Sequence, residues 1–162
     1  MANSYEGRCA CGEVGYRMNS APLFVHACHC TECQRLSGGA FAVNALIETD
    51  RVETLAGAAE PVPVTGTSGK PQTIYRCPRC KVALWSRYPG AGRKLTFVRV
   101  GTLDEPARLP PDIHIFISTK LPWIELPDGV PAVKEYYSAR SCWPPESLKR
   151  RARLRATGRE DS

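Results

Sequence analysis

Long apolar runs are missing from this sequence, and so are internal repeats. No uninterrupted apolar segment approaches the roughly 18 residues that a membrane span requires. The segment from Met1 to Cys9 holds no apolar stretch of the kind found in a signal peptide. No linker is long enough to divide the chain into two large domains. These absences predict a soluble, cytoplasmic protein with no membrane partner.

Acidic residues are fewer than basic ones, 16 against 22, which gives a formal net charge of +6. Much of the excess lies in residues 146–162, which hold six basic and three acidic side chains. The rest of the chain has no large basic field and no aromatic residues interleaved with basic ones. We therefore do not expect nucleic-acid binding. We predict a main domain at 1–145 and a basic C-terminal tail at 146–162.

Composition supports a folded chain with a real core. The 162 residues are 43% hydrophobic and 23% charged, which excludes a disordered protein. The apolar pattern predicts a mainly β fold. Strands are expected at residues 14–18, 23–27, 41–47, 51–55, 74–76, 82–88, 95–100 and 113–118. A loop rich in Gly, Pro and Thr is expected at 57–72, and helices only at 31–37 and 145–156.

Cysteine is abundant, and its spacing is informative. The eight cysteines are at positions 9, 11, 28, 30, 33, 77, 80 and 142, so that all but the last fall into tight groups. Cysteines one or two residues apart can direct several sulfur atoms at one ion. In a reducing compartment such groups are more often metal ligands than disulfides, with redox pairs as the main alternative. Soft thiolates favour zinc over hard cations.

The seven clustered cysteines divide naturally into four and three. A structural zinc has four protein ligands, whereas a catalytic zinc has three and keeps one position open. The pairs 9/11 and 77/80 can form a closed site, and Cys28, Cys30 and Cys33 form a compact triplet. Spacing alone leaves another partition open, in which a different pair completes the triplet.

Three ordered motifs resemble the glutathione-dependent formaldehyde-activating enzyme (GFA) family. They are GRCACGEV at 7–14, CHCTECQRLSG at 28–38 and CPRC at 77–80. The segments 100–106, 114–116 and 120–129 are also similar to that family. The resemblance covers about residues 5–131.

This resemblance implies an Mss4-like fold, with zinc-bound antiparallel sheets and few short helices. It also implies two zinc ions per chain. Cys9, Cys11, Cys77 and Cys80 match the structural ligands, and Cys28, Cys30 and Cys33 match the ligands of the catalytic zinc. The implied activity is that of a carbon–sulfur lyase that forms S-(hydroxymethyl)glutathione from formaldehyde and glutathione, or a related adduct of a small thiol and a small aldehyde.

An open zinc position suits this chemistry. A thiol becomes a good nucleophile as the thiolate, which zinc stabilises, and zinc can also polarise an aldehyde oxygen. Three thiolate ligands soften the acidity of zinc, so we expect a thiol at the open position. The alternatives are a protein-binding scaffold with two closed zinc sites and a nucleic-acid-binding module. Seven thiolates and two Zn²⁺ would lower the formal charge from +6 to +3, which argues against nucleic acid.

The three histidines have structural as well as functional interpretations. An imidazole at His29 could be a fourth ligand or a proton carrier. If residues 28–30 are extended, however, its side chain points away from those of the flanking cysteines. His26 is expected to pack in or beside a strand, and His114 to be a satisfied histidine of the core.

Four further residues and the tail are less informative. Cys142 stands alone, which favours a structural or spare thiol. Arg35 and Ser37 could hold a glutathione carboxylate, or equally cap a helix or face solvent. Trp123 could line a pocket, although core packing is more frequent for tryptophan. The basic tail is expected to be a solvated helix face.

Overall fold

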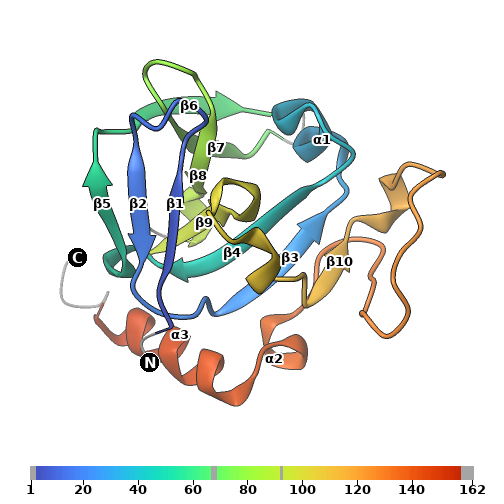
Figure 1. Cartoon of the computed structure of the whole chain (residues 1–162). Helices are drawn as coiled ribbons and strands as arrows, with labels where there is room; N and C mark the ends of the chain where they lie inside the picture. Colours follow the sequence, from blue (N-terminus) through green and yellow to red (C-terminus); the bar gives the residue numbers. More distant parts are fainter. Residues whose placement is uncertain (1–2, 67–68, 92, 158–162) are drawn as a thin grey trace.

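The computed structural model describes residues 3–66, 69–91 and 93–157, and β-sheet dominates it (Figure 1). The strands are β1 (Tyr5–Arg8), β2 (Gly15–Met18), β3 (Phe24–Cys28), β4 (Ala42–Glu48), β5 (Val52–Ala56), β6 (Glu60–Thr65), β7 (Pro71–Arg76), β8 (Ala83–Arg87), β9 (Leu95–Arg99) and β10 (Ile113–Ile115). The α-helices are α1 (Thr31–Ser37), α2 (Ala139–Cys142) and α3 (Pro145–Ala156). Short 3₁₀ turns occur at Thr49–Arg51, Pro89–Ala91, Val100–Thr102, Pro106–Arg108 and Ile117–Thr119. The prediction of a mainly β fold with few short helices is confirmed.

The strands of the described residues form two sheets. The small sheet has the order β1-β2-β5, and the large sheet has the order β10-β3-β4-β9-β8-β7-β6. Neighbouring strands are antiparallel except for β10, which runs parallel to β3. The expectation of antiparallel sheets therefore holds everywhere except at this edge.

The predicted loop at 57–72 is wrong in part, because it contains β6 and the start of β7. Residues 67–68 of that loop lie outside the described residues. Pro61 and Pro63 argued against a strand at β6, because proline cannot donate a hydrogen bond to a neighbouring strand. Since β6 pairs only with β7 at the end of the large sheet, its prolines are tolerated at an edge. The strand β1 and the short helix α2 were also not predicted.

One core lies between the two sheets. Strand register places Val25, Ala45, Val98 and Trp85 side by side on the face of the large sheet that meets the small one. Tyr16 from β2 packs edge-on against Trp85, with ring centroids 5.5 Å apart. Cys9 and Cys77 are buried in this core.

A second core lies on the opposite face of the large sheet. Phe24, Leu46 and Phe97 occupy this face, and the C-terminal segment covers them. Tyr137 and Trp143 pack on Phe24 with ring centroids 5.3 and 6.0 Å away. Cys28 and Cys33 belong to this second core, so the two cysteine groups are built into different cores.

The helix α3 packs on the body rather than standing in solvent. The Ser147 hydroxyl donates to the Leu23 carbonyl at 2.6 Å. The Arg150 guanidinium forms an ion pair with Glu48. The Arg150 side chain is only 13% exposed, and the Glu48 side chain only 5%. The expected solvated face is therefore limited to the outer side of the helix, where Arg153 is exposed. The proposed boundary at residue 145 stays a prediction, and residues 158–162 lie outside the described residues.

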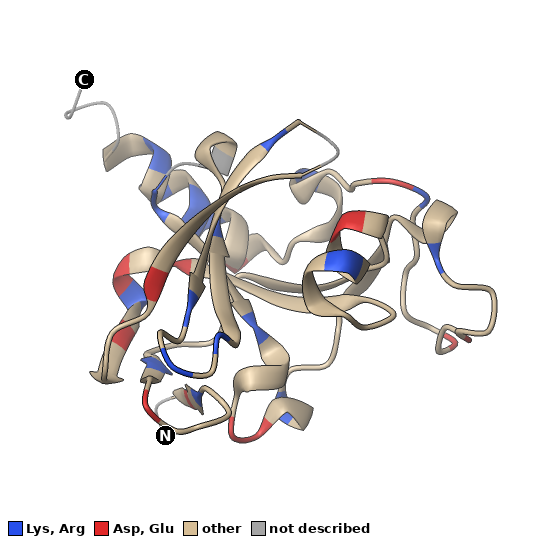
Figure 2. Cartoon of the chain, turned by 90° about the horizontal axis from the view of Figure 1, so that it is seen from above, with Lys and Arg blue, Asp and Glu red and all other residues tan. Residues whose placement is uncertain are grey.

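Figure 2 shows several of the lysines and arginines of the chain on α3. None of the helices in the described part of the chain combines the length and the apolar character that crossing a bilayer would need.

Candidate metal centres

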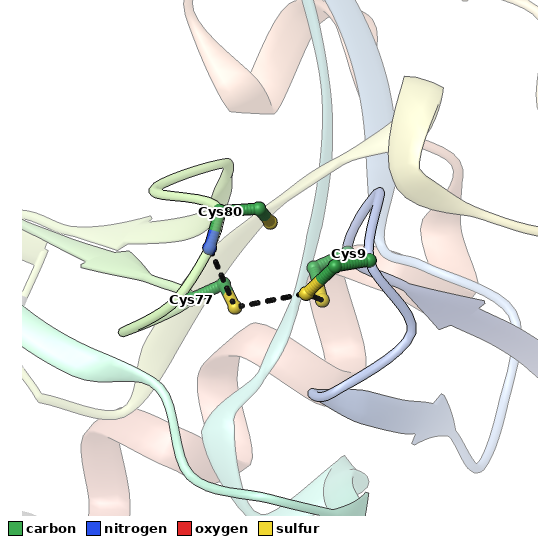
Figure 3. A group of neighbouring side chains, drawn as sticks. Cys9, Cys77 and Cys80 are labelled. Atoms are coloured by element: carbon green, nitrogen blue, oxygen red, sulfur yellow. Dashed lines mark hydrogen bonds between the residues drawn. The ribbon is translucent and has the colours of Figure 1, made fainter.

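Two turns of similar design carry the four-cysteine group (Figure 3). The N–H of Cys9 donates to the carbonyl of Val14, five residues on, and the N–H of Cys77 donates to Val82 at the same spacing. Each turn also needs one residue with positive φ, Gly12 at 79° and Lys81 at 61°. The repeated geometry curls the backbone around the sulfur atoms.

Backbone N–H groups point at these sulfurs. The N–H of Val14 donates to Cys9 Sγ at 3.3 Å, and the N–H of Cys80 donates to Cys77 Sγ at 3.5 Å. The pKa of the Cys80 thiol is lowered to about 6, first because the Val82 N–H donates to it. A thiolate is therefore stabilised here before any metal binds.

The four sulfurs of Cys9, Cys11, Cys77 and Cys80 lie within 4.8 Å of one another. Cys11 Sγ is 3.6 Å from Cys9 Sγ and 3.7 Å from Cys77 Sγ. A tetrahedral zinc with Zn–S bonds of about 2.3 Å would place its sulfurs about 3.8 Å apart. The separations and the all-sulfur donor set therefore fit a closed four-coordinate site.

The second group comes from one short segment. Cys28 ends β3, Cys30 is the N-cap of α1, and Cys33 lies in the first turn of that helix. The N–H of Cys33 donates to Cys30 Sγ at 3.3 Å. Cys28 Sγ and Cys30 Sγ are 3.4 Å apart, and all three sulfurs lie within 4.8 Å. Cys28 and Cys33 are buried, whereas Cys30 is partly exposed.

Negative charge in this triplet concentrates on its central cysteine. The pKa of Cys30 is lowered to about 2, first by a hydrogen bond from Cys28 and then by one from Cys33. The pKa of Cys28 is raised, because its thiol donates to Cys30. A soft cation that replaced the shared protons would satisfy all three sulfurs. The donor set therefore fits a metal with three protein ligands.

The structure thus brings together the seven predicted cysteines in the predicted partition. Their role as zinc ligands, and the open position at the triplet, stay predictions. Cys142 lies in α2 and belongs to neither group.

A cation beside the triplet was missed by the sequence analysis. Arg99 ends β9 on the same face as Cys28, and its guanidinium donates to Asn44 Oδ1 and, at 2.9 Å, to Ser86 Oγ. Among the described residues, no carboxylate forms an ion pair with Arg99. Hydrogen bonds within the triplet and burial raise the pKa of Cys33 overall, and the charge of Arg99 acts in the opposite direction. One signal in the sequence could have identified Arg99. In β9, Leu95 and Phe97 alternate with other residues, and Arg99 occupies the next position of that apolar series.

The histidines lie around this site without joining the cysteine groups. His29 is fully buried and turned toward His114, with Nε2 2.9 Å from Nδ1 of that residue. It also packs against Phe41, with ring centroids 4.8 Å apart and the rings tilted by 36°. His26 is buried in β3, and Nδ1 lies 3.3 Å from the Tyr137 hydroxyl. The expectation that the His29 side chain points away from the flanking cysteines is thus met, as is the core position of His114.

Burial decides the charge of these rings. It lowers the pKa of His29 to about 4 and that of His26 to about 3, so both imidazoles are neutral at pH 7. A neutral pair of rings can share one hydrogen between His29 and His114, whereas two charged rings would repel each other. This favours a structural role for the histidine pair.

The other candidates sit at the surface. Arg35 is exposed on α1, and a role in holding a carboxylate stays a prediction. Ser37 Oγ accepts from the N–H of Gly39 at 3.1 Å, which supports a capping role at the end of α1. Trp123 is 69% exposed and lines a cavity of about 530 Å³ with His114, so core packing is wrong for this tryptophan.

Comparisons with known proteins agree with this arrangement. The family model for glutathione-dependent formaldehyde-activating enzyme matches residues 4–119. A Penicillium rubens protein named as a candidate enzyme of this kind is 32% identical over 117 residues, which are 68% of this chain and 58% of that protein. A Talaromyces marneffei protein of the same name is 26% identical over 137 residues, 81% of this chain and 70% of that protein.

The chain thus spans little more than half the length of the Penicillium relative. A crystal structure of a Rhodobacter sphaeroides protein aligns with a TM-score of 0.45 and 19% identity, over 61% of this chain and 87% of that one. The family match takes in all seven clustered cysteines and most of the described β structure. The chain belongs to the glutathione-dependent formaldehyde-activating enzyme family.

Proposed function

We propose that this protein is a zinc-dependent carbon–sulfur lyase that adds a thiol to an aldehyde, with glutathione and formaldehyde as the first pair to test. The enzymes of this family are carbon–sulfur lyases, and the matching relatives are named for this reaction. One observation of the chain carries the proposal. The sulfurs of Cys28, Cys30 and Cys33 converge within 4.8 Å, and no fourth His, Cys, Asp or Glu of the described residues completes their group.

The reaction is an addition without oxidation or reduction. The thiol sulfur forms a bond to the carbonyl carbon, the second bond of the carbonyl opens, and the thiol hydrogen ends on the oxygen. The reverse reaction cleaves the carbon–sulfur bond and returns both reactants. The enzyme therefore needs a place for a thiolate, a way to remove its proton and a donor near the developing oxygen.

Cys28, Cys30 and Cys33 would hold the catalytic zinc, while Cys9, Cys11, Cys77 and Cys80 would hold the structural one. When bound by three thiolates, zinc keeps one coordination position open and lowers the pKa of a thiol that occupies it.

Arg99 contributes charge to this site. Three thiolates and one Zn²⁺ carry a net charge of −1, and the half-buried guanidinium beside them offsets it. Because Arg99 is fixed by Asn44 and Ser86, its position does not depend on a bound substrate. An incoming thiolate would add negative charge, so this arginine lowers the electrostatic cost of binding it.

The test uses the zinc-loaded chain with glutathione and ¹³C-formaldehyde, and measures adduct formation by NMR against the uncatalysed rate. We expect saturable acceleration in both reactants. Cys30→Ser removes a proposed ligand and should abolish the acceleration, whereas Cys142→Ser, a cysteine outside both groups, should retain it.

Three outcomes would contradict the proposal. An unchanged rate with a fully zinc-loaded chain would exclude this reaction for glutathione and formaldehyde. A fourth protein ligand at the triplet, seen in the metal-bound structure, would instead support the scaffold with two closed sites. Tight, salt-dependent DNA binding would favour the nucleic-acid alternative.

A further inference from the structure

A large cavity lies against the second core, the apolar cluster to which Cys28 and Cys33 also belong. Its volume is about 930 Å³, close to the upper end of the range of small-molecule sites. Its walls come from β9, the segment after β8, and the C-terminal part from Tyr136 to Arg155. The family match ends at residue 119, so the C-terminal wall lies outside the matched region.

The floor of this cavity is aromatic. Its aromatic lining consists of Tyr88, Phe97, Tyr136, Tyr137 and Trp143. Tyr88 meets Phe97 edge-on at 4.8 Å, and Tyr136 stacks on Tyr137 at 4.7 Å. Phe97, Tyr137 and Trp143 belong to the same apolar cluster as Cys28 and Cys33. The lining residue Tyr88 is also near enough to Cys33 and Cys28 to interact with them electrostatically. The cavity and the proposed catalytic metal site therefore share one apolar cluster, although none of the three cysteines lines the cavity.

The rim of the cavity is cationic. The charged residues that line it are Lys70, Arg93, Lys94, Arg151 and Arg155, and no aspartate or glutamate is among the lining residues. The Lys94 ammonium already donates to the carbonyl of Leu154 at 3.3 Å and to the Thr157 hydroxyl at 3.2 Å. The three arginines of the rim form no ion pair with a carboxylate of the described residues.

Arg151 is the best-placed of them. Its guanidinium lies over the Trp143 ring, 5.1 Å from the ring centroid, which positions it directly above the aromatic floor. Burial, and next the charge of Arg155, lower its pKa. No carboxylate of the described residues pairs with Arg151, so an anion at this rim would relieve repulsion between the two arginines.

These features define one class of ligand. Glutathione could place its two carboxylates at the cationic rim, but its ammonium group and its two peptide bonds do not match an aromatic floor. Formaldehyde carries only hydrogen atoms on its carbonyl carbon, so it has no substituent that could fill the cavity. An aromatic or alkyl chain would bury its surface on the floor, and a carboxylate at its end would meet the arginines.

We infer that the aldehyde substrate of this protein is an apolar aldehyde with a carboxylate, bound with its organic group in this cavity. The inference rests on the proposed function and changes only the second reactant. The thiol sulfur again bonds to the carbonyl carbon, and the thiol hydrogen ends on the oxygen.

The probe is 4-formylbenzoate, and its neutral counterpart is 4-methylbenzaldehyde. Calorimetry with the zinc-loaded chain, without a thiol, should show at least about 10-fold tighter binding of the anion, as expected for a charge-assisted hydrogen bond. Arg151→Gln should remove this preference. Arg153→Gln lies on the same helix but outside the cavity lining, and should keep it.

A second variant guards against effects on folding. Arg93 is exposed and lies just before β9 rather than in α3, so Arg93→Gln should fold normally and weaken the anion more than the neutral probe. Equal binding of both probes by the unmodified chain, or the same loss in Arg153→Gln as in Arg151→Gln, would overturn the inference.

The final step separates this inference from the proposed function. Glutathione is added, and adduct formation from 4-formylbenzoate and from formaldehyde is measured by NMR. We expect the rate to saturate at a lower concentration of 4-formylbenzoate than of formaldehyde. In Arg151→Gln, the KM for 4-formylbenzoate should rise. Acceleration with formaldehyde but no binding of 4-formylbenzoate would overturn the inference alone. Binding of 4-formylbenzoate in the cavity without any acceleration would overturn the proposed reaction and, with it, the assignment of this molecule as a substrate.

Discussion

Cysteines that lie 66 residues apart in the chain meet at the four-cysteine group, whereas the triplet comes from one strand end and the helix that follows it. The first group ties the turn after β1 to the turn after β7, between the two sheets. The second group lies on the other face of the large sheet, beside Arg99 and a large cavity. The same side-chain type is thus used in two structural settings.

This difference has an energetic consequence. Joining distant segments removes much of the freedom of the unfolded chain, so a metal at the four-cysteine group would stabilise the whole fold. Closing a loop within residues 28–33 removes little freedom. A metal at the triplet would therefore contribute mainly local order, and we expect that it would exchange a ligand without loosening the fold.

The largest expected effect is that of Cys77→Ser. Structural zinc contributes about 10–16 kcal/mol in small zinc domains, comparable with the whole stability of an ordinary domain. We expect little folded, soluble protein. Soluble yield, thermal unfolding and zinc content measure the effect, with Cys142→Ser as the matched control. A variant with the Tm of the unmodified chain would contradict the assignment of this group as structural.

The next effect concerns the helix that covers the second core. Arg150→Met leaves Glu48 nearly buried with only Arg51 near it, at 3.6 Å. Removing one partner of a buried ion pair costs about 3 kcal/mol or more, so we expect a clear loss in urea unfolding. Arg153→Met is the control, because Arg153 is exposed.

This ion pair also has a pH signature. Although burial opposes ionisation of Glu48, the Arg150 guanidinium keeps its pKa below the ordinary value of 4.5. The pair therefore stabilises the fold above that value, and the contribution is lost as pH falls through the lowered pKa. The difference in unfolding free energy between the unmodified chain and Arg150→Met should shrink on acidification. A difference independent of pH would contradict this assignment.

Local patterns predicted local structure well. The cysteine spacing favoured a division into four and three, which the family resemblance supported, and the bounds 31–37 and 145–156 match α1 and α3. The errors arose where tertiary context overrides local preference. Pro61 and Pro63 by themselves favour a loop. They are nevertheless part of a strand, because β6 pairs with β7 at the edge of the sheet.

The surroundings of the triplet were harder to foresee, because they depend on the fold as a whole. The pairing of β4 with β9 brings the charge of Arg99 close enough to act on Cys33, and no local pattern encodes this pairing. The cavity is bounded by residues from Leu46 to Arg155. Its aromatic and basic residues are separated widely in sequence, so neither its floor nor its rim forms a motif.

A smaller loss of stability is expected for Cys30→Ser. Serine is a good N-cap, so its hydroxyl can accept the Cys33 N–H at the start of α1. We expect a loss of less than about 2 kcal/mol, together with loss of the second metal and of any acceleration. Circular dichroism and elemental analysis measure the two effects separately. Unfolding as severe as that of Cys77→Ser would remove the distinction between the two groups.

The smallest effect is expected for His29→Phe, which tests whether the triplet has three protein ligands or four. The phenyl ring can keep the packing against Phe41, and the main loss is the hydrogen bond to His114, worth about 1 kcal/mol. Because His29 Nε2 faces His114 rather than the sulfurs, the absorption spectrum of cobalt bound at the triplet should not change. His114→Phe is the matched control, since it breaks the same hydrogen bond from a residue outside the segment 28–33. A spectral change in His29→Phe alone would identify His29 as a fourth ligand, which would close the position that the thiol needs.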